Sequence, residues 1–149
     1  LDIMRRSLIN LKFIDDEYNQ NGRELYEVTQ LVNTFLGALI HPFEASKKAN
    51  PFRSLLMSKN CPEFVDVGKY PHCNNYYEFI RLLRNGLCHG HIRYNEGKIK
   101  NIDSVDIWNE QKRQITFLCK LSIENMRRIL TDFAYFLECV AVEPLECLH

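Results

Sequence analysis

One stretch constrains the fold of this chain most, an amphipathic helix predicted over residues 74–91. At about 100° per residue, its apolar and polar side chains separate onto two sides. The apolar, core-facing side holds Phe79, Ile80, Leu82, Leu83, Gly86 and Leu87. The polar side holds Tyr77, Arg81, Arg84, Asn85, Cys88 and His89. The polar side is either a solvated surface or a site, and the chain can turn away at Gly90.

Size and charge limit the class of protein. The chain has 149 residues, which predicts a single domain over residues 1–149 with one core. Its formal net charge at pH 7 is zero, so any site for a polyanion must be a local patch. The sequence has no apolar run of membrane-spanning length and no secretory signal, which predicts a cytoplasmic protein without a membrane partner.

The cysteines give no strong signal for a metal site or a disulfide framework. Six are scattered without a CxxC pair, which predicts reduced thiols. Cys61 and Cys73 lie in a loop with His72, which leaves a structural zinc ion as an alternative. Their spacing matches no common zinc module, so we expect no metal ion and no other cofactor.

Apolar periodicity predicts helices on both sides of a small β meander. Helices are expected at about residues 1–16, at 24–40 with an end at Pro42, at 52–58, and from a cap at Ser122 to about residue 140. Short strands are expected at 92–94, 98–102, 105–108 and 114–118, with the last turn at 110–113. This meander, about residues 92–119, is expected to be an appendage inserted before the last helix.

The end of the polar helix side carries a short motif. The residues are Arg84-Asn85-Gly86-Leu87-Cys88-His89. This run resembles the motif of the HEPN family, in which an Arg followed by a polar residue precedes a His near a helix end. The similarity extends from about residue 5 to residue 137 and looks like a small stand-alone branch from plasmid and bacterial genomes. The resemblance implies a mainly α fold, a HEPN-like antiparallel helical bundle.

The resemblance also implies an activity, that of a metal-independent endoribonuclease. It implies a homodimer in which two motif helices face each other and form one composite active site. RNA is the expected substrate, and the expected role of the protein is that of a toxin or a defence effector. A cognate antitoxin or a regulatory protein is the further expected partner.

The residue types at the motif suit this chemistry. His89 and Arg84 are the expected catalytic residues, because an imidazole transfers protons near neutral pH and a guanidinium stabilises charge on phosphorus. Asn85, Arg81 and His91 are expected to bind substrate, and His91 is either a second proton carrier or a structural residue. Arg84 and His89 are about 140° apart on an ideal helix, which favours a site built by two chains.

Two other interpretations of the polar helix side stay open. One is a non-catalytic module that binds a nucleotide, RNA or a protein in the same cleft. The other is a dimer interface held by polar contacts. Toxins of the family that are paired with a nucleotidyltransferase often carry a Tyr two positions after the motif His. This chain has His91 at that position.

Overall fold

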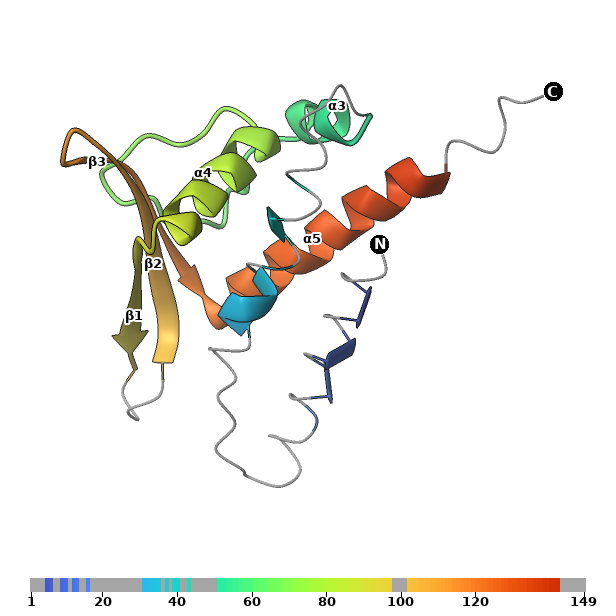
Figure 1. The fold of residues 1–149 in the computed structure, drawn as a ribbon, viewed down its shortest axis with the longest axis horizontal. Coiled ribbons are helices and arrows are strands. Elements are labelled where there is room, and N and C mark those ends of the chain that lie inside the picture. The colour runs from blue at the N-terminus through green and yellow to red at the C-terminus, as the bar shows by residue number, and fades with distance from the viewer. Residues whose placement is uncertain are drawn as a thin grey trace.

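The computed structural model describes residues 5, 6, 9, 10, 12, 13, 16, 31–35, 37, 39, 40, 43, 51–97 and 102–142, with the backbone only of 141 and 142. Six elements follow one another in the order α3 (Pro51–Ser58), α4 (Tyr76–Cys88), β1 (Ile92–Glu96), β2 (Ile102–Gln111), β3 (Gln114–Ser122) and α5 (Ile123–Val142) (Figure 1). The described residues between 5 and 16 and between 31 and 43 are helical. The remainder of the two helices predicted near the N-terminus lies outside the described residues. Phe43 is helical, although the sequence predicted an end at Pro42.

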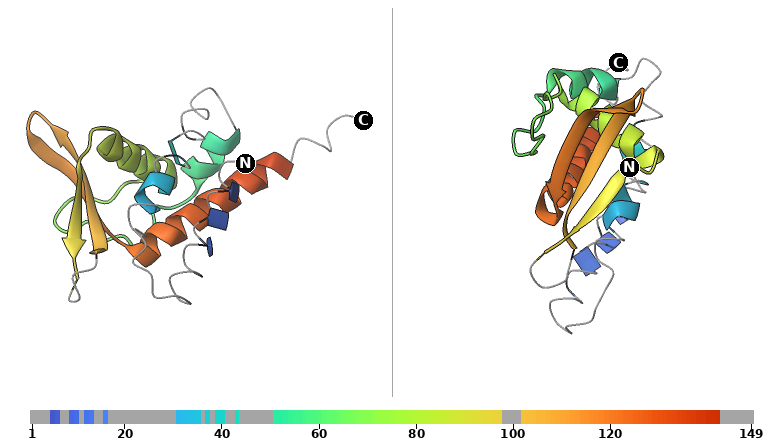
Figure 2. Two further views of the ribbon diagram at one scale, coloured as in Figure 1. Left: turned by 60° about the horizontal axis from the view of Figure 1, so that its bottom comes forward. Right: turned by 90° about the vertical axis from the view of Figure 1, so that its left-hand side faces the viewer.

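The sheet is one layer of the core, and the helices cover one of its faces. The strands are antiparallel in the order β1-β2-β3. α4 contacts β2, and α5 contacts β3 and β2. Both helices lie on the same side of the sheet (Figures 1 and 2). The strand residues in the shared hydrophobic core are Val105, Ile107, Phe117, Cys119 and Leu121.

The predicted mainly α, HEPN-like helical bundle is therefore wrong, although an antiparallel meander does precede the last helix as predicted. The described architecture is α+β, a three-stranded antiparallel sheet with helices packed on one face. The physical reason is the alternation in β2 and β3, which turns every second side chain toward α4 and α5. That apolar face must be buried, and the helices bury it.

Strand β2 also differs from the sequence prediction. It runs unbroken from Ile102 to Gln111, where two separate strands had been predicted, and residues 98–101 lie outside the described residues. Gln111 pairs with Gln114, so the turn contains two residues rather than four. Ser104, which fell between two predicted strands, and Asp106 both lie in β2 with their side chains directed away from the core.

Helix α4 approaches β2 very closely near its carboxyl end. A Cβ atom added to Gly86 would lie 2.7 Å from Ile107 Cγ2 and 2.7 Å from the Trp108 carbonyl oxygen. Nearby, Asn109 Nδ2 donates a hydrogen bond of 2.6 Å to the Leu82 carbonyl oxygen. The absence of a side chain at Gly86 and the amide of Asn109 therefore fix where this end of α4 lies on the sheet.

The segment between α3 and α4 lies along β3 and carries a disulfide. Lys120 N donates to Asp66 O at 2.8 Å, which places this segment at the β3 edge. Cys61 and Cys73 form a disulfide with their Cα atoms 6.0 Å apart. The prediction of reduced thiols is therefore wrong for this pair. The segment folds back on itself between the two cysteines, and their spacing along the chain does not reveal that path.

In the described part of the chain, every helix is too short or too polar to cross a bilayer.

Candidate functional site at the carboxyl end of α4

Helix α4 begins at an asparagine cap. Asn75 is its N-cap, and Asn75 Oδ1 accepts a hydrogen bond of 2.9 Å from Glu78 N. Glu78 Oε2 in turn accepts one of 2.8 Å from Asn74 N. These reciprocal bonds satisfy backbone donors that the first turn leaves free, much as a capping box does. The start of the helix is therefore fixed by short-range contacts.

The carboxyl end of α4 is a Schellman motif. Gly90 has φ +69°, and its N–H donates to Leu87 O at 3.1 Å. His91 N donates to Gly86 O at 2.8 Å. His89 is thus the C-cap, and Gly90 takes the left-handed conformation that turns the chain into β1. Because of this termination, the His89 side chain is exposed beyond the last helical turn.

The two sides of α4 are placed as predicted except at Tyr77, which was expected on the polar side but is half-buried and packs against the core. Its buried residues are Tyr76, Phe79, Ile80, Leu83, Gly86 and Leu87, and Leu82 is half-buried. On the polar side, Arg81, Cys88 and His89 are exposed, and Arg84 and Asn85 are half-buried. The polar side is accordingly accessible to solvent toward the carboxyl end of the helix.

Arg84 is held by neighbouring side chains. Arg84 Nη1 donates a hydrogen bond of 2.8 Å to Asn85 Oδ1. The Arg84 guanidinium carbon lies 5.9 Å from the centre of the Phe43 ring, within the range of a cation–π contact. Asn85 therefore uses its side-chain oxygen to orient Arg84, leaving its amide N–H groups as possible donors to a ligand.

His89 and His91 lie together at the helix–strand junction. Their ring centres are 5.8 Å apart. His91 also stacks on Trp108, with ring centres 5.5 Å apart and an interplanar angle of 8°. Among the described residues, no partner hydrogen-bonds the buried His91 Nδ1. Stacking on Trp108 thus sets the plane of the second imidazole, and the first is open to solvent.

Trp108 is a site residue that the sequence reasoning missed. It reaches His91 through strand pairing, since Trp108 N donates to His91 O at 3.1 Å. Its indole Nε1 donates to Glu110 Oε1 at 2.9 Å. The register of β1 on β2 brings these residues together, and no local motif marks that register. The only available signal was that Trp108 is the single tryptophan of the chain.

Arg81 lies one turn earlier on α4. It is exposed, and its Nη2 is 3.6 Å from Glu78 Oε1. Exposed pairs of this kind contribute little stability, so this arginine can exchange its partner for a ligand anion at low cost.

The structure thus joins the predicted residues in two pairs, Arg84 with Asn85 and His89 with His91. The Arg84 guanidinium lies beside Phe43, and His89 caps the helix about 140° further round its axis. Within the described residues, no three His, Cys, Asp or Glu side chains gather as a metal-binding group. The arrangement offers fixed positive charge and proton-transferring imidazoles at one helix end.

Comparison with known proteins places the chain in a family. The family model described as HEPN pEK499 p136 matches residues 1–141. No curated protein and no solved structure shows significant similarity to the chain.

Proposed function

The chain belongs to the HEPN pEK499 p136 family, and from this membership we propose that it is a metal-independent endoribonuclease with a composite active site at a homodimer interface. The observation that carries the proposal is the pairing of Arg84 with Asn85 and of His89 with His91 at the exposed end of α4. A guanidinium and an imidazole are the groups that cleavage of RNA needs when no metal takes part.

The proposed reaction is attack of the ribose 2′-hydroxyl on the adjacent phosphorus. His89 takes the hydroxyl proton as the oxygen–phosphorus bond forms. Arg84 donates hydrogen bonds to the phosphate oxygens, where negative charge increases. The bond from phosphorus to the 5′-oxygen then breaks, and that oxygen receives a proton from His91. Arg81 and Asn85 hold neighbouring phosphates.

Two chains are proposed because Arg84 and His89 diverge around one helix. A second α4 facing the first across a two-fold axis brings Arg84 of one protomer toward His89 of the other. Gly86 does not serve this contact, because it lies against Ile107 and Trp108 of its own chain. The proposed partner helix therefore meets the side that carries Arg81, Arg84 and Asn85.

The test is cleavage of single-stranded RNA in EDTA. We expect cleavage by the wild type and at least about 100-fold slower cleavage by Arg84→Ala and by His89→Ala. Matched controls are Arg113→Ala at the β2–β3 turn and His72→Ala before α4, both exposed and away from the helix end. RNA with a 2′-deoxynucleotide at the cleaved position must resist, since it lacks the attacking hydroxyl.

Cleavage that persists in both Arg84→Ala and His89→Ala contradicts the proposal. Saturable RNA binding without turnover by the wild type favours the non-catalytic module instead. The proposed role as a toxin or defence effector has its own test. Induced expression in a bacterial host should slow growth, and His89→Ala should remove that effect at equal protein level.

A further inference from the structure

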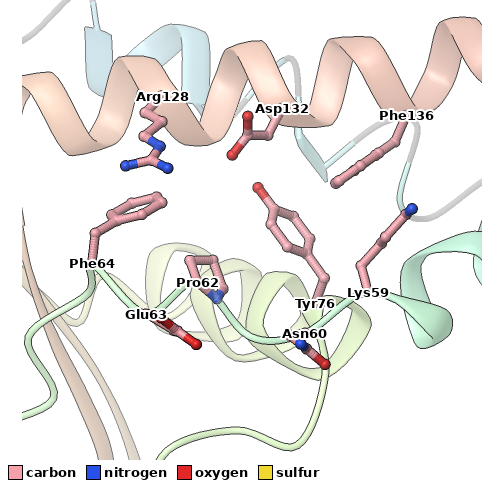
Figure 3. Close-up of a pocket in the computed structure, with 9 residues that line it drawn as sticks. All are labelled: Lys59, Asn60, Pro62, Glu63, Phe64, Tyr76, Arg128, Asp132 and Phe136. Atoms are coloured by element: carbon pink, nitrogen blue, oxygen red, sulfur yellow. The ribbon is translucent and has the colours of Figure 1, made fainter.

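A cavity of about 620 Å³ lies between α5 and residues 59–64, beside the amino end of α4 (Figure 3). Its volume is within the range of small-molecule sites. Tyr76, the first residue of α4, lines it, whereas His89 caps the other end of this 13-residue helix. The two places are about 20 Å apart along the helix axis. The cavity is therefore separate from the site at the carboxyl end of α4.

Aromatic rings form one part of the cavity wall. Tyr76 is buried, and its ring centre is 5.1 Å from that of Phe136, with an interplanar angle of 85°. Tyr76 Oη donates a hydrogen bond of 3.4 Å to the Ile129 carbonyl oxygen, which ties the ring to α5. The half-buried Phe136 presents ring surface to the cavity. This wall suits a planar ring of a ligand.

Four charged side chains line the cavity, and Glu63 is the one that does not stand by the aromatic rings (Figure 3). Arg128 lies at one end, its guanidinium carbon 4.2 Å from the centre of the Phe64 ring. Lys59 lies at the other end, its Nζ 5.9 Å from the Phe136 ring centre. Asp132 lies between them and points toward the Tyr76 hydroxyl (Figure 3). Stacking on Phe64 fixes the plane of the guanidinium and leaves its N–H groups as donors.

The order of groups along α5 is a cation, a carboxylate and an aromatic ring. Arg128, Asp132 and Phe136 are spaced by four residues each, so they share one side of α5 and span about 12 Å. Burial raises the pKa of Asp132, and the nearby Arg128 opposes that shift. A ligand that donates hydrogen bonds to this carboxylate compensates for its lost hydration.

We propose that the cavity binds a nucleoside monophosphate unit, with its phosphate at Arg128, its ribose hydroxyls at Asp132 and its base against Phe136. A guanidinium fork matches phosphate oxygens, and a carboxylate is a common acceptor for ribose hydroxyls. An organic cation fits less well, because Lys59 and Arg128 already place positive charge over the aromatic rings. A bare anion would not contact the aromatic part of the cavity wall.

The unit can be a free nucleotide or the phosphorylated end of an RNA chain. The experiment titrates the full chain calorimetrically with the four nucleoside 5′-monophosphates, their 2′-deoxy counterparts, inorganic phosphate, and a trinucleotide with and without a 5′-phosphate. We expect saturable binding of at least one ribonucleotide below about 1 mM. A free nucleotide is the source if it binds as tightly as the phosphorylated trinucleotide, and RNA is the source if the trinucleotide binds at least about 10-fold more tightly.

Three variants test the assigned contacts. Arg128→Ala should weaken ribonucleotide binding at least about 10-fold. Asp132→Asn should remove the preference for ribonucleotides over 2′-deoxynucleotides. Phe136→Leu should weaken the binding of nucleotides but not the binding of inorganic phosphate. Arg113→Ala and Glu96→Gln, at exposed positions on the sheet that do not line the cavity, should bind as the wild type does.

The inference is independent of RNA cleavage at α4, so His89→Ala should bind nucleotide normally. Loss of binding in His89→Ala with retention in Arg128→Ala moves the site to α4 and overturns the inference. So does the absence of saturable binding by every nucleotide, or phosphate binding as tight as nucleotide binding. Binding unchanged in both Arg128→Ala and Asp132→Asn overturns it as well.

Discussion

At the scale of single residues, Gly86 controls the contact between α4 and β2. In Gly86→Ala the new Cβ would lie 2.7 Å from the Trp108 carbonyl oxygen, a backbone atom that cannot rotate away. The helix must shift, and we expect a loss of about 1–3 kcal/mol in the free energy of unfolding. This loss should exceed the gain of up to about 1 kcal/mol from the better helix propensity of alanine. Urea denaturation measures the difference.

The matched control for that change is Gly37→Ala. Gly37 is also helical, but a Cβ added there meets no atom of the described residues within 4 Å. Its replacement should therefore stabilise the protein by about 0.5–1 kcal/mol. Equal changes in the free energy of unfolding for Gly86→Ala and Gly37→Ala would show that the close contact with β2 does not determine the effect of a side chain at position 86.

Asp132 should make stability depend on pH in a direction opposite to that of most carboxylates. Burial raises its pKa above the ordinary 3.8 in the folded protein. The folded state therefore binds this proton more tightly than the unfolded state does, and the resulting stability is present below pH 3.8 and lost as pH rises through the folded pKa. Asp132→Asn should raise the melting temperature at pH 7 and leave it unchanged near pH 3. A lower melting temperature at pH 7 would contradict this assignment.

At the scale of elements, the β2–β3 hairpin contains local strain. Lys112 and Arg113 have φ values of +50° and +63°, the left-handed region that Asn and Gly adopt more readily. Replacing the pair by Asn-Gly should increase the free energy of unfolding by about 1–2 kcal/mol, because the strain is removed. Thermal unfolding tests this. An Ala-Ala replacement is the control, since it shortens both side chains but keeps the strain, and it should give no such gain.

The disulfide is the element-scale feature that ties residues 59–64 to the start of α4. It closes a short loop, because Cys61 and Cys73 are 12 positions apart. Changing both to Ser should lower the free energy of unfolding by about 2–3 kcal/mol through the greater freedom of the unfolded chain. Guanidinium denaturation without reductant measures it. Cys88→Ser, at an exposed free thiol, is the control and should have no effect. Equal stability of the wild type with and without reductant would argue against the bond.

At the scale of the whole molecule, structure that depends on neighbouring residues could be predicted from the sequence, whereas structure that depends on contacts between distant segments could not. Helix α4 could be predicted, because its cap at Asn75, its apolar periodicity and its ending at Gly90 are all short-range features. Ser122 likewise caps α5 as predicted, with Asn125 N donating to its hydroxyl at 3.1 Å. These elements depend only on residues within a turn or two of each other.

The place of the sheet in the core could not be predicted from such short-range features. Asp106 falls in a predicted strand, but the sequence does not show that β1 lies beside it, where Arg93 Nε and Asn95 Nδ2 donate to its carboxylate at 3.2 and 2.8 Å. Only the pairing register makes a buried carboxylate acceptable in β2. The same holds for the stack of His91 on Trp108, and for the cavity between α5 and residues 59–64. Each joins segments that the sequence separates.

Assembly is the last property at this scale, and the proposed composite site makes a quantitative prediction about it. If each site takes Arg84 from one protomer and His89 from the other, Arg84→Ala and His89→Ala chains are both inactive alone. Mixed and allowed to exchange, half of the dimers are heterodimers, and each regenerates one intact site of two. The mixture should then recover about one quarter of wild-type RNA cleavage. If both residues of a site come from one chain, a heterodimer contains no intact site and mixing recovers no activity. The comparison needs only the two variants and a cleavage assay, with size-exclusion chromatography to confirm that exchange took place.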